Sequence, residues 1–380
     1  MAKTYAEIND KIKKGTAVVL TAEEVSELAK TLSPKEIAEK VDVVTTATFG
    51  AMCSSGAFLN FGHANPPIRM EKIELNGIRV SGGLAAVDTY VGATDCNPEN
   101  PAYGGAHIIE DLVAGKEITL EAWGKGTDCY PRKHIKTRIT KDTINEAILY
   151  NPRNAYQNYN VATNSTDKIK YTYMGTLLPK LRNASYSTAG ELSPLLNDPE
   201  CRTIGLGTRI FLCGTEGYVT WNGTQFHSTK EVNEYGIPTS NARTIAVIGD
   251  LKNMSTDFLR GVYYEKYGVS LFVGIGIPIP ILDEDLARRV SIRNEQIETT
   301  VVDYGDGNKI LGKTNYAALQ SGEIEVNGHK IRTTPVASLA KARQIADILK
   351  SWIQKGDFLL TEPVRPMPTG TKLKNLEIVD

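Results

Sequence analysis

The sequence predicts an α/β or α+β fold in which mixed sheets carry flanking helices. Helix start signals alternate along the chain with short runs of β-branched and apolar residues. Some of these runs are continuously apolar and others alternate with polar residues, which favours both buried and half-exposed strands. At 380 residues, we expect one catalytic unit, with a division into two lobes at about 1–165 and about 166–380 as a further option.

The N-terminal part alternates between helices and strands. Thr4 and Thr21 each stand three residues before a glutamate, the pattern of a capping box that opens a helix. Between them, residues 17–20 (AVVL) predict a strand. Ser33 followed by Pro34 predicts the start of another helix, and residues 41–50 (VDVVTTATFG) predict a buried strand that leads into small residues.

Asn-Gly pairs between alternating apolar residues are a strong short-range signal for β-hairpins. They predict hairpins at residues 72–81 (KIELNGIRVS), 218–227 (YVTWNGTQFH) and 323–332 (EIEVNGHKIR). Because the pattern is shared hairpin chemistry, it does not indicate an internal repeat.

The remaining elements follow from periodicity and from Gly and Pro. Residues 105–115 predict a short helix that ends at a glycine, and Thr334-Pro335 predicts the start of a long helix that ends before Gly356. The further predicted strands are 117–123, 134–140, 244–250 and 269–275.

Composition excludes several classes of protein. The 43 basic and 44 acidic residues give a net charge of −1, which provides no global field for nucleic acid or anionic lipid. The charged N-terminus is no secretory signal, and the most apolar run, residues 269–282, is too short and too rich in Pro and Gly to span a bilayer. We therefore expect a cytoplasmic protein.

The five cysteines are Cys53, Cys96, Cys129, Cys201 and Cys213. No two are separated by two residues, the spacing on which zinc ribbons and ferredoxin clusters depend. We therefore expect no metal site and no cofactor bound by this chain. If the protein does redox chemistry, its electrons are expected to come from another molecule.

The loop between the strands predicted at 117–123 and 134–140 reads KGTDCYPRKH, with Cys129 at its centre. Lys125, Arg132 and Lys133 supply the positive charge that favours a thiolate, and the glycines around Lys125 allow unusual backbone angles. The alternative interpretation is that Cys129 is a small buried hydrophobic residue. The residues alone leave both open.

Two further stretches combine a cysteine, glycines and a histidine. In residues 49–67, Cys53 and Gly56 are followed by His63, where backbone amides and an imidazole could meet a ligand. In residues 91–111, Gly104 and Gly105 precede a helix that holds His107, an arrangement that suits an anion. The alternative for each stretch is a packed turn with a capping histidine.

Residues 150–164 (YNPRNAYQNYNVATN) are rich in Asn, Gln and Tyr and contain Arg153. Such side chains could line a polar pocket in which Arg153 binds a carboxylate through two parallel hydrogen bonds. The alternative is an irregular segment held by its own hydrogen bonds.

Three stretches resemble the homocysteine biosynthesis family, whose characterised archaeal members are L-aspartate semialdehyde sulfurtransferases. They are VVTTATFGAMCSSGAFLNFGHANPPI, YGGAHIIEDLVAGKEITLEAWGKGTDCYPRK and LYNPRNAYQNYNVATN. The similarity runs through nearly the whole chain. Some members carry a C-terminal pair of CBS domains, and we expect neither a CBS nor a ferredoxin module in this chain.

The resemblance implies that sulfide sulfur is transferred to the aldehyde carbon of L-aspartate 4-semialdehyde, which gives L-homocysteine. It places a cysteine persulfide on Cys129, in the GTDCYPR motif, and a second functional thiol on Cys53. Because the reaction consumes two electrons, an external reductant is required, and the usual partner in the family is a ferredoxin-type iron–sulfur protein. Whether Cys53 and Cys129 form a disulfide during turnover is left open by the sequence.

For the other roles we hypothesise from residue type alone. Arg132 or Lys133 would favour the Cys129 thiolate, and His63 or His107 would protonate the developing alkoxide. Amides near Gly56 or Gly104 and Gly105 would stabilise the oxyanion, and Arg153 or Arg69 would hold the substrate carboxylate. A homo-oligomer is an option that the sequence leaves open.

Two other functions remain alternatives at this point. One is a non-catalytic sulfur carrier or scaffold subunit, whose partner would do the chemistry. The other is a thiol–disulfide oxidoreductase, against which the missing C-x-x-C pair argues.

Overall fold

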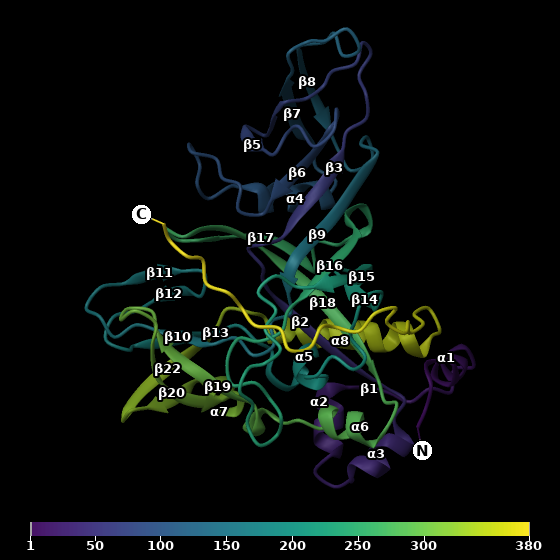
Figure 1. Ribbon diagram of the computed structural model, residues 1–380, viewed down its shortest axis with the longest axis vertical. Coiled ribbons are helices and arrows are strands. Elements are labelled where there is room, and N and C mark those ends of the chain that lie inside the picture. Colours follow the sequence, from purple (N-terminus) through teal and green to yellow (C-terminus); the bar gives the residue numbers. More distant parts are fainter. Residues whose placement is uncertain (1, 380) are drawn as a thin grey trace.

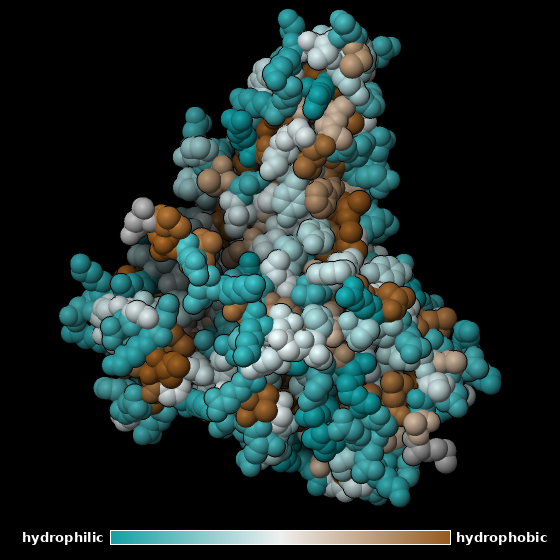
Figure 2. All heavy atoms as spheres, viewed as in Figure 1, coloured by the Kyte–Doolittle hydropathy of each residue, from teal (hydrophilic) through white to brown (hydrophobic). Residues whose placement is uncertain are grey.

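The computed structural model describes residues 2–379 and shows a broad base from which an arm rises (Figure 1). The predicted mixture of helices and mixed sheets is confirmed. On the face shown in Figure 2, hydrophilic residues cover most of the base, and hydrophobic ones occur in scattered patches.

The main sheet runs through the base and into the arm, in the order β1-β2-β18-β14-β15-β16-β9-β3-β6, with β17 paired to β18. Its strands are β1 (Val19–Thr21), β2 (Val43–Ala51), β3 (Gly56–Asn60), β6 (Asp88–Gly92), β9 (Glu146–Asn154), β14 (Arg209–Leu212), β15 (Thr215–Asn222), β16 (Ile245–Asp250), β17 (Leu259–Tyr264) and β18 (Gly268–Pro280).

The centre of this sheet is the long antiparallel pair of β2 and β18, in register from Val43 with Pro280 to Ala51 with Phe272. Residues 43–50 of β2 are all buried, as expected for a strand rich in β-branched residues and covered on both faces. The sheet takes strands from both sides of residue 165, and the division into two lobes stays a prediction.

A second sheet lies beside the first in the base, in the order β20-β19-β10-β13-β22-β21. Its strands are β10 (Val161–Thr163), β13 (Asn183–Tyr186), β19 (Glu298–Asp303), β20 (Lys309–Asn315), β21 (Glu323–Val326) and β22 (His329–Pro335). The hairpin of β11 (Lys170–Thr172) and β12 (Gly175–Leu177) extends next to it.

The arm, residues 56–145, combines β3 and β6 with an antiparallel sheet of order β5-β4-β7-β8. Its further strands are β4 (Lys72–Leu75), β5 (Ile78–Val80), β7 (Ile118–Trp123) and β8 (His134–Ile139). The β7–β8 hairpin lies at the end of the arm that points away from the base (Figure 1).

Helices cover the edges and faces of the base, and one lies in the arm. The α-helices are α1 (Tyr5–Lys13), α2 (Ala22–Leu28), α3 (Pro34–Lys40), α4 (Gly105–Val113), α5 (Pro194–Asn197), α6 (Glu284–Val290), α7 (Tyr316–Ser321) and α8 (Leu339–Gln354), and the 3₁₀ helices are η1 (Gly190–Leu192), η2 (Leu251–Asn253) and η3 (Asn294–Gln296). The capping residues Thr4, Thr21 and Ser33 all begin helices as predicted.

Two local predictions are wrong. The Asn-Gly pair in residues 218–227 does not close a hairpin, because β15 pairs with the distant β16. The amide of Gly223 donates a hydrogen bond to the carbonyl of Thr244. The long C-terminal helix begins at Leu339 with Ser338 as its cap. Thr334 and Pro335 belong to β22 instead, because this segment pairs in parallel with β13.

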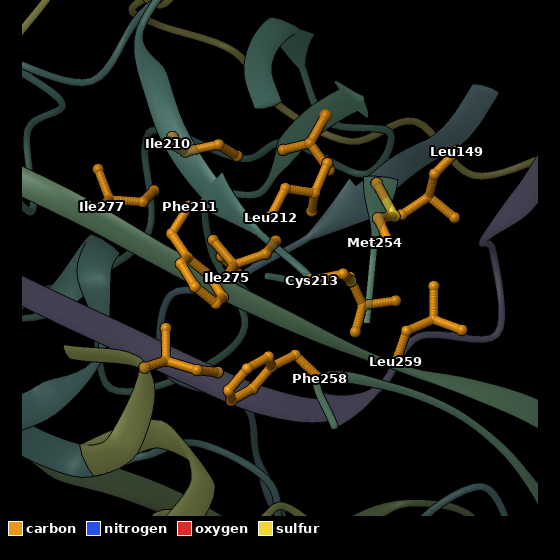
Figure 3. Close-up of a cluster of buried hydrophobic side chains, with 14 of the residues drawn as sticks. Leu149, Ile210, Phe211, Leu212, Cys213, Met254, Phe258, Leu259, Ile275 and Ile277 are labelled. Carbon is orange, nitrogen blue, oxygen red and sulfur yellow. The ribbon is translucent and has the colours of Figure 1, made fainter. Parts of the chain in front are cut away.

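The hydrophobic core is continuous through the main sheet. The side chains labelled in Figure 3 surround Cys213, which is fully buried between β14 and β18. Burial raises the pKa of the Cys213 thiol to about 12, so this cysteine behaves as a packed apolar residue.

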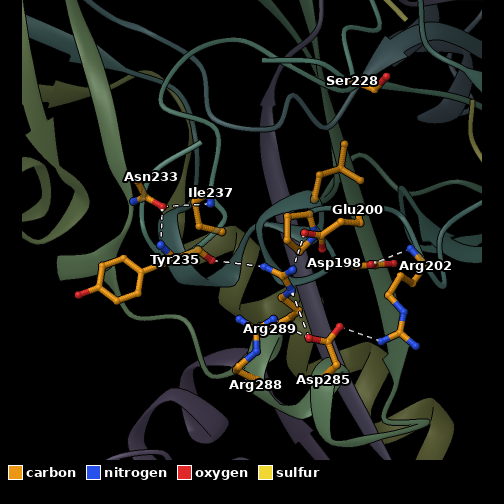
Figure 4. Close-up of polar contacts among 12 residues, drawn as sticks. Asp198, Glu200, Arg202, Ser228, Asn233, Tyr235, Ile237, Asp285, Arg288 and Arg289 are labelled. Carbon is orange, nitrogen blue, oxygen red and sulfur yellow. Dashed lines mark hydrogen bonds and ion pairs between the residues drawn. The ribbon is translucent and has the colours of Figure 1, made fainter. Parts of the chain in front are cut away.

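Ion pairs attach α6 to the segment around residue 200, as the close-up in Figure 4 shows. Arg289 contacts Glu200 at 2.6 Å, and Arg202 contacts Asp283 at 2.6 Å and Asp285 at 3.1 Å. These pairs are partly exposed, so each is worth at most about 1 kcal/mol.

Candidate active site around Cys53

Cys53 lies where the central strand β2 ends and the chain turns into the arm. The amide of Met52 still bonds to the carbonyl of Leu271 at 2.8 Å, and the amide of Ser55 bonds back to Met52 at 3.0 Å. This tight turn leaves the half-buried Cys53 beside β18, where Ser270 Oγ donates a hydrogen bond to Cys53 Sγ at 3.3 Å.

A cavity of about 420 Å³ opens at this turn, which is within the size range of small-molecule sites. It lies where the end of β2 meets the β11–β12 hairpin and the segments that flank the second sheet. Its lining residues are Thr48, Gly50, Ala51, Met52, Cys53, Ser54, Arg153, Ala155, Tyr156, Tyr159, Tyr173, Met174, Ser187, Thr188, Ser193, Pro194, Gln225, Tyr267 and Val336.

Arg153 is the cation of this cavity, and it comes from the end of β9. Its backbone is fixed because Asn151 Oδ1 accepts bonds from the Arg153 amide at 2.9 Å and from Ser54 Oγ at 3.0 Å. Its Nη1 donates to Tyr156 Oη at 3.4 Å, while its buried Nε has no partner. An unpaired buried donor is costly unless a ligand satisfies it, so Arg153 is suited to bind an anion here.

Four tyrosines form much of the cavity wall: Tyr156, Tyr159, Tyr173 and Tyr267. Tyr159 and Tyr173 make an edge-to-face ring contact at 6.1 Å, and Tyr173 meets Tyr267 in the same way at 5.9 Å. Burial and the neighbouring Cys53 thiol raise the pKa of Tyr267 to about 12. Tyr173, Tyr267 and Ser270 were not predicted as site residues. Each comes from a hairpin that only folding brings to Cys53.

Cys129 lies elsewhere, in the exposed loop between β7 and β8. Thr127 and Tyr130 close this loop through reciprocal backbone bonds of 2.9 and 3.1 Å, and Thr127 Oγ1 lies 3.5 Å from Cys129 Sγ. The ring of Tyr130 stacks on His63, with centroids 6.1 Å apart. Cys129 does not line the cavity at Cys53, and both thiols are free.

Four of the basic residues predicted to act at the site lie around the Cys129 loop: His63, Arg69, Arg132 and Lys133. Arg132 donates from Nε and Nη2 to the carbonyls of Pro66 and Asn65, both at 3.0 Å. Lys133 packs against Gly126, and the carbonyl of Arg69 lies against Gly124. The structure therefore places these four residues around the loop that carries Cys129, whereas Arg153 shares a cavity with Cys53.

The three predicted anion-binding glycines are sites of close packing. A side chain at Gly56 would collide with Tyr90, and one at Gly105 with the carbonyl of Gly92. Gly104 meets the carbonyl of Asp95 in the same way. None of the three lines the cavity.

His107 lies in the first turn of α4, outside the cavity. Its Nδ1 accepts a hydrogen bond from the amide of Gly104 at 3.1 Å, and its ring stacks on Tyr103. Burial lowers the pKa of His107, which keeps the ring neutral in this capping position.

Over residues 2–379, no three His, Cys, Asp or Glu side chains lie close enough together to bind a metal ion. In the same residues, no helix is both long and apolar enough to cross a membrane.

Known proteins that match this chain share nearly its whole length. A model of the family described as "Homocysteine biosynthesis enzyme, sulfur-incorporation" matches residues 17–360. The L-aspartate semialdehyde sulfurtransferase of Methanosarcina acetivorans is 48% identical over 379 residues, which are 99% of this chain and 74% of that protein. The protein of the same name from Methanocaldococcus jannaschii is 51% identical in an alignment 381 positions long, which covers 95% of this chain and 72% of that protein.

A more distant relative, an uncharacterized protein of Methanothermobacter thermautotrophicus, is 27% identical in an alignment 349 positions long, which covers 89% of this chain and 77% of that protein. No solved structure matches the chain.

Proposed function

Because this chain belongs to the family of homocysteine biosynthesis enzymes that act in sulfur incorporation, we propose that it transfers sulfur to L-aspartate 4-semialdehyde and forms L-homocysteine. Two relatives that share about half of its residues over nearly its whole length are named L-aspartate semialdehyde sulfurtransferase. The similarity covers both cysteine stretches, so it supports the activity as well as the family.

The observation that carries this proposal is that Cys53 and Arg153 line one cavity. The substrate has a carboxylate at one end and an aldehyde at the other. Arg153 would bind the carboxylate through its guanidinium group, as arginines commonly do. The aldehyde would then reach toward Cys53, where the outer sulfur of a Cys53 persulfide forms the new bond to carbon.

We assign different roles to the two thiols. Cys129, exposed on the arm among Arg132, Lys133 and His63, would attack a sulfane sulfur of polysulfide and keep it as a persulfide, while the shortened polysulfide leaves. The Cys53 thiolate would attack the outer persulfide sulfur, which forms a persulfide on Cys53 and releases the Cys129 thiolate. Because Cys129 does not line the cavity, this exchange requires that the arm moves or that a second copy supplies its Cys129.

The electron balance requires a reductant. Aldehyde, hydrogen sulfide, two electrons and two protons give thiol and water. When the sulfur is held as a persulfide, the demand rises to four electrons and four protons, because the outer sulfur is two electrons more oxidised than sulfide. A ferredoxin-type iron–sulfur protein is the class of partner that we propose as the donor.

Turnover by the purified chain tests the proposed function. After the chain is loaded with polysulfide, L-homocysteine should form on addition of L-aspartate 4-semialdehyde and a low-potential chemical reductant, and Cys53→Ser should abolish it. Cys96→Ser is the matched control, since Cys96 is exposed and lies outside the cavity. If the unaltered chain forms no homocysteine under these conditions, the alternative of a non-catalytic carrier subunit is favoured.

A further inference from the structure

The cavity at Cys53 contains a limited set of proton donors. Among the described residues that line it, the ionisable side chains are Cys53, Arg153 and the tyrosines at 156, 159, 173 and 267, with no His, Asp, Glu or Lys. Addition of sulfur to an aldehyde produces an alkoxide that needs a proton. A guanidinium does not release its protons in proteins, so the phenol hydroxyls are the acids that remain besides water and the thiol.

One of these hydroxyls is held by two others. Tyr159 Oη donates a hydrogen bond to Tyr173 Oη at 2.9 Å, and Tyr304 Oη lies 2.7 Å from Tyr173 Oη on its other side. Tyr159 precedes β10, Tyr173 lies in the β11–β12 turn, and Tyr304 follows β19. When Tyr304 also donates, Tyr173 accepts two bonds and has its own proton free for the cavity that it lines.

The electrostatics support this direction of the bonds. Burial and the hydrogen bond to Tyr173 raise the pKa of Tyr159 and that of Tyr304. Both neighbours therefore keep their protons, so each has a hydrogen to donate to Tyr173. Two hydrogen bonds donated to the Tyr173 oxygen would stabilise the negative charge that develops there as its proton is transferred.

We propose that Tyr173 is the catalytic acid that protonates the aldehyde oxygen as sulfur adds to its carbon, and that Tyr159 and Tyr304 position it. This proposal rests on the proposed function of the cavity. The O–H bond of Tyr173 breaks, a new O–H bond forms on the substrate oxygen, and no electrons change hands. The phenolate recovers its proton from water before the next turnover.

Other ionisable side chains also lie around Tyr173. Tyr267 faces Tyr173 from the β17–β18 hairpin. The ring centroids of Tyr156 and Tyr159 lie 4.8 Å apart, and Tyr156 accepts a hydrogen bond from Arg153. Burial raises the pKa of both Tyr156 and Tyr267 above the ordinary value. Lys266, at the tip of the same hairpin, is bonded to Tyr171 at 3.3 Å, and in Figure 1 this hairpin reaches toward β11 and β12.

The test compares phenylalanine variants in the homocysteine assay. Tyr173→Phe should lower kcat by about 100-fold, within the range for loss of a general acid, and remove the alkaline limb of its pH profile. The KM for the semialdehyde should stay within about threefold, because the hydroxyl acts on the reacting oxygen alone. Tyr304→Phe and Tyr159→Phe should lower kcat less and move the alkaline limb to higher pH, since each removes one donor to the phenolate.

Tyr171→Phe is the matched control, because Tyr171 lies in the β11–β12 hairpin that also holds Tyr173 but does not line the cavity. The pH profile of kcat in Tyr171→Phe should be unchanged. Full activity of Tyr173→Phe would overturn the assignment of Tyr173 as the acid but not the proposed function. If Tyr173→Phe does not fold, an alkaline limb that stays in place in both Tyr304→Phe and Tyr159→Phe would overturn the same assignment. No homocysteine from the unaltered chain would overturn the proposed function, and this inference with it.

Discussion

Ser270 Oγ lies 3.3 Å from Cys53 Sγ and donates a hydrogen bond to it, which joins β18 to the turn that follows β2. This hydrogen bond holds the sulfur in place and offers a donor to negative charge that develops on it. Ser270 is fully buried, so water does not replace its hydroxyl easily.

Ser270→Ala should therefore slow alkylation of Cys53 by iodoacetamide at pH 7, by up to about fivefold for a hydrogen bond worth about 1 kcal/mol. The exposed Cys96 provides an internal control in the same sample, since its rate should not change. Equal Cys53 rates in the two proteins would show that the hydroxyl does not activate this thiol.

Arg153→Ala should raise the KM for L-aspartate 4-semialdehyde by about 10- to 100-fold, because a charge-assisted hydrogen bond is worth about 1.5–3 kcal/mol. Arg153→Lys should recover only part of the loss, since a lysine cannot make two parallel bonds to a carboxylate. Arg182→Ala, at an exposed position outside the cavity, is the control. If KM is unchanged in Arg153→Ala, the carboxylate is bound elsewhere.

Asp42 gives a prediction about stability and pH. Its side chain is 2% exposed and accepts hydrogen bonds from Lys3 at 2.9 Å, Lys11 at 2.7 Å and the Val18 amide at 3.0 Å. Burial works against the charge, but these bonds outweigh it and hold the pKa of Asp42 below its usual value.

Asp42→Asn should lower the free energy of unfolding at pH 7 by about 3 kcal/mol, because it leaves Lys3 without its buried partner. A depressed folded-state pKa contributes stability above the unfolded-state value, and this contribution is lost as pH falls through the folded-state value. The difference between the two proteins in urea unfolding should thus be largest at neutral pH and shrink below about pH 4. Asp10→Asn, at an exposed position, should behave as the unaltered chain at every pH.

The elements that the sequence predicts correctly are those whose signal is local. Asn76 with Gly77 and Asn327 with Gly328 close hairpins because both residues of each pair adopt positive φ, which side-chain identity alone favours. The pair at 222–223 fails because the partner of β15 lies more than twenty residues further on, so tertiary pairing decides its structure.

The site was predictable only in part for the same reason. Cys53 and Arg153 both stand in unusual stretches, yet no spacing places them in one cavity, since pairing of β3 with β9 brings these segments together. Tyr173 and Tyr267 could not be singled out among 17 tyrosines. They reach Cys53 only because the β11–β12 and β17–β18 hairpins meet beside the turn after β2.

The central claim, that sulfur passes from Cys129 to Cys53 and leaves as homocysteine, is tested most directly by mapping sulfur on each cysteine. The chain would be loaded with polysulfide, which supplies sulfane sulfur, and the extra sulfur atom located by peptide mass analysis before and after addition of L-aspartate 4-semialdehyde and reductant. In Cys53→Ser the extra sulfur should accumulate on Cys129 and persist when the semialdehyde is added without reductant, whereas in the unaltered chain with both additions it should leave as homocysteine is formed. Homocysteine formation by Cys53→Ser at the unaltered rate, or extra sulfur on neither Cys53 nor Cys129, would contradict the account.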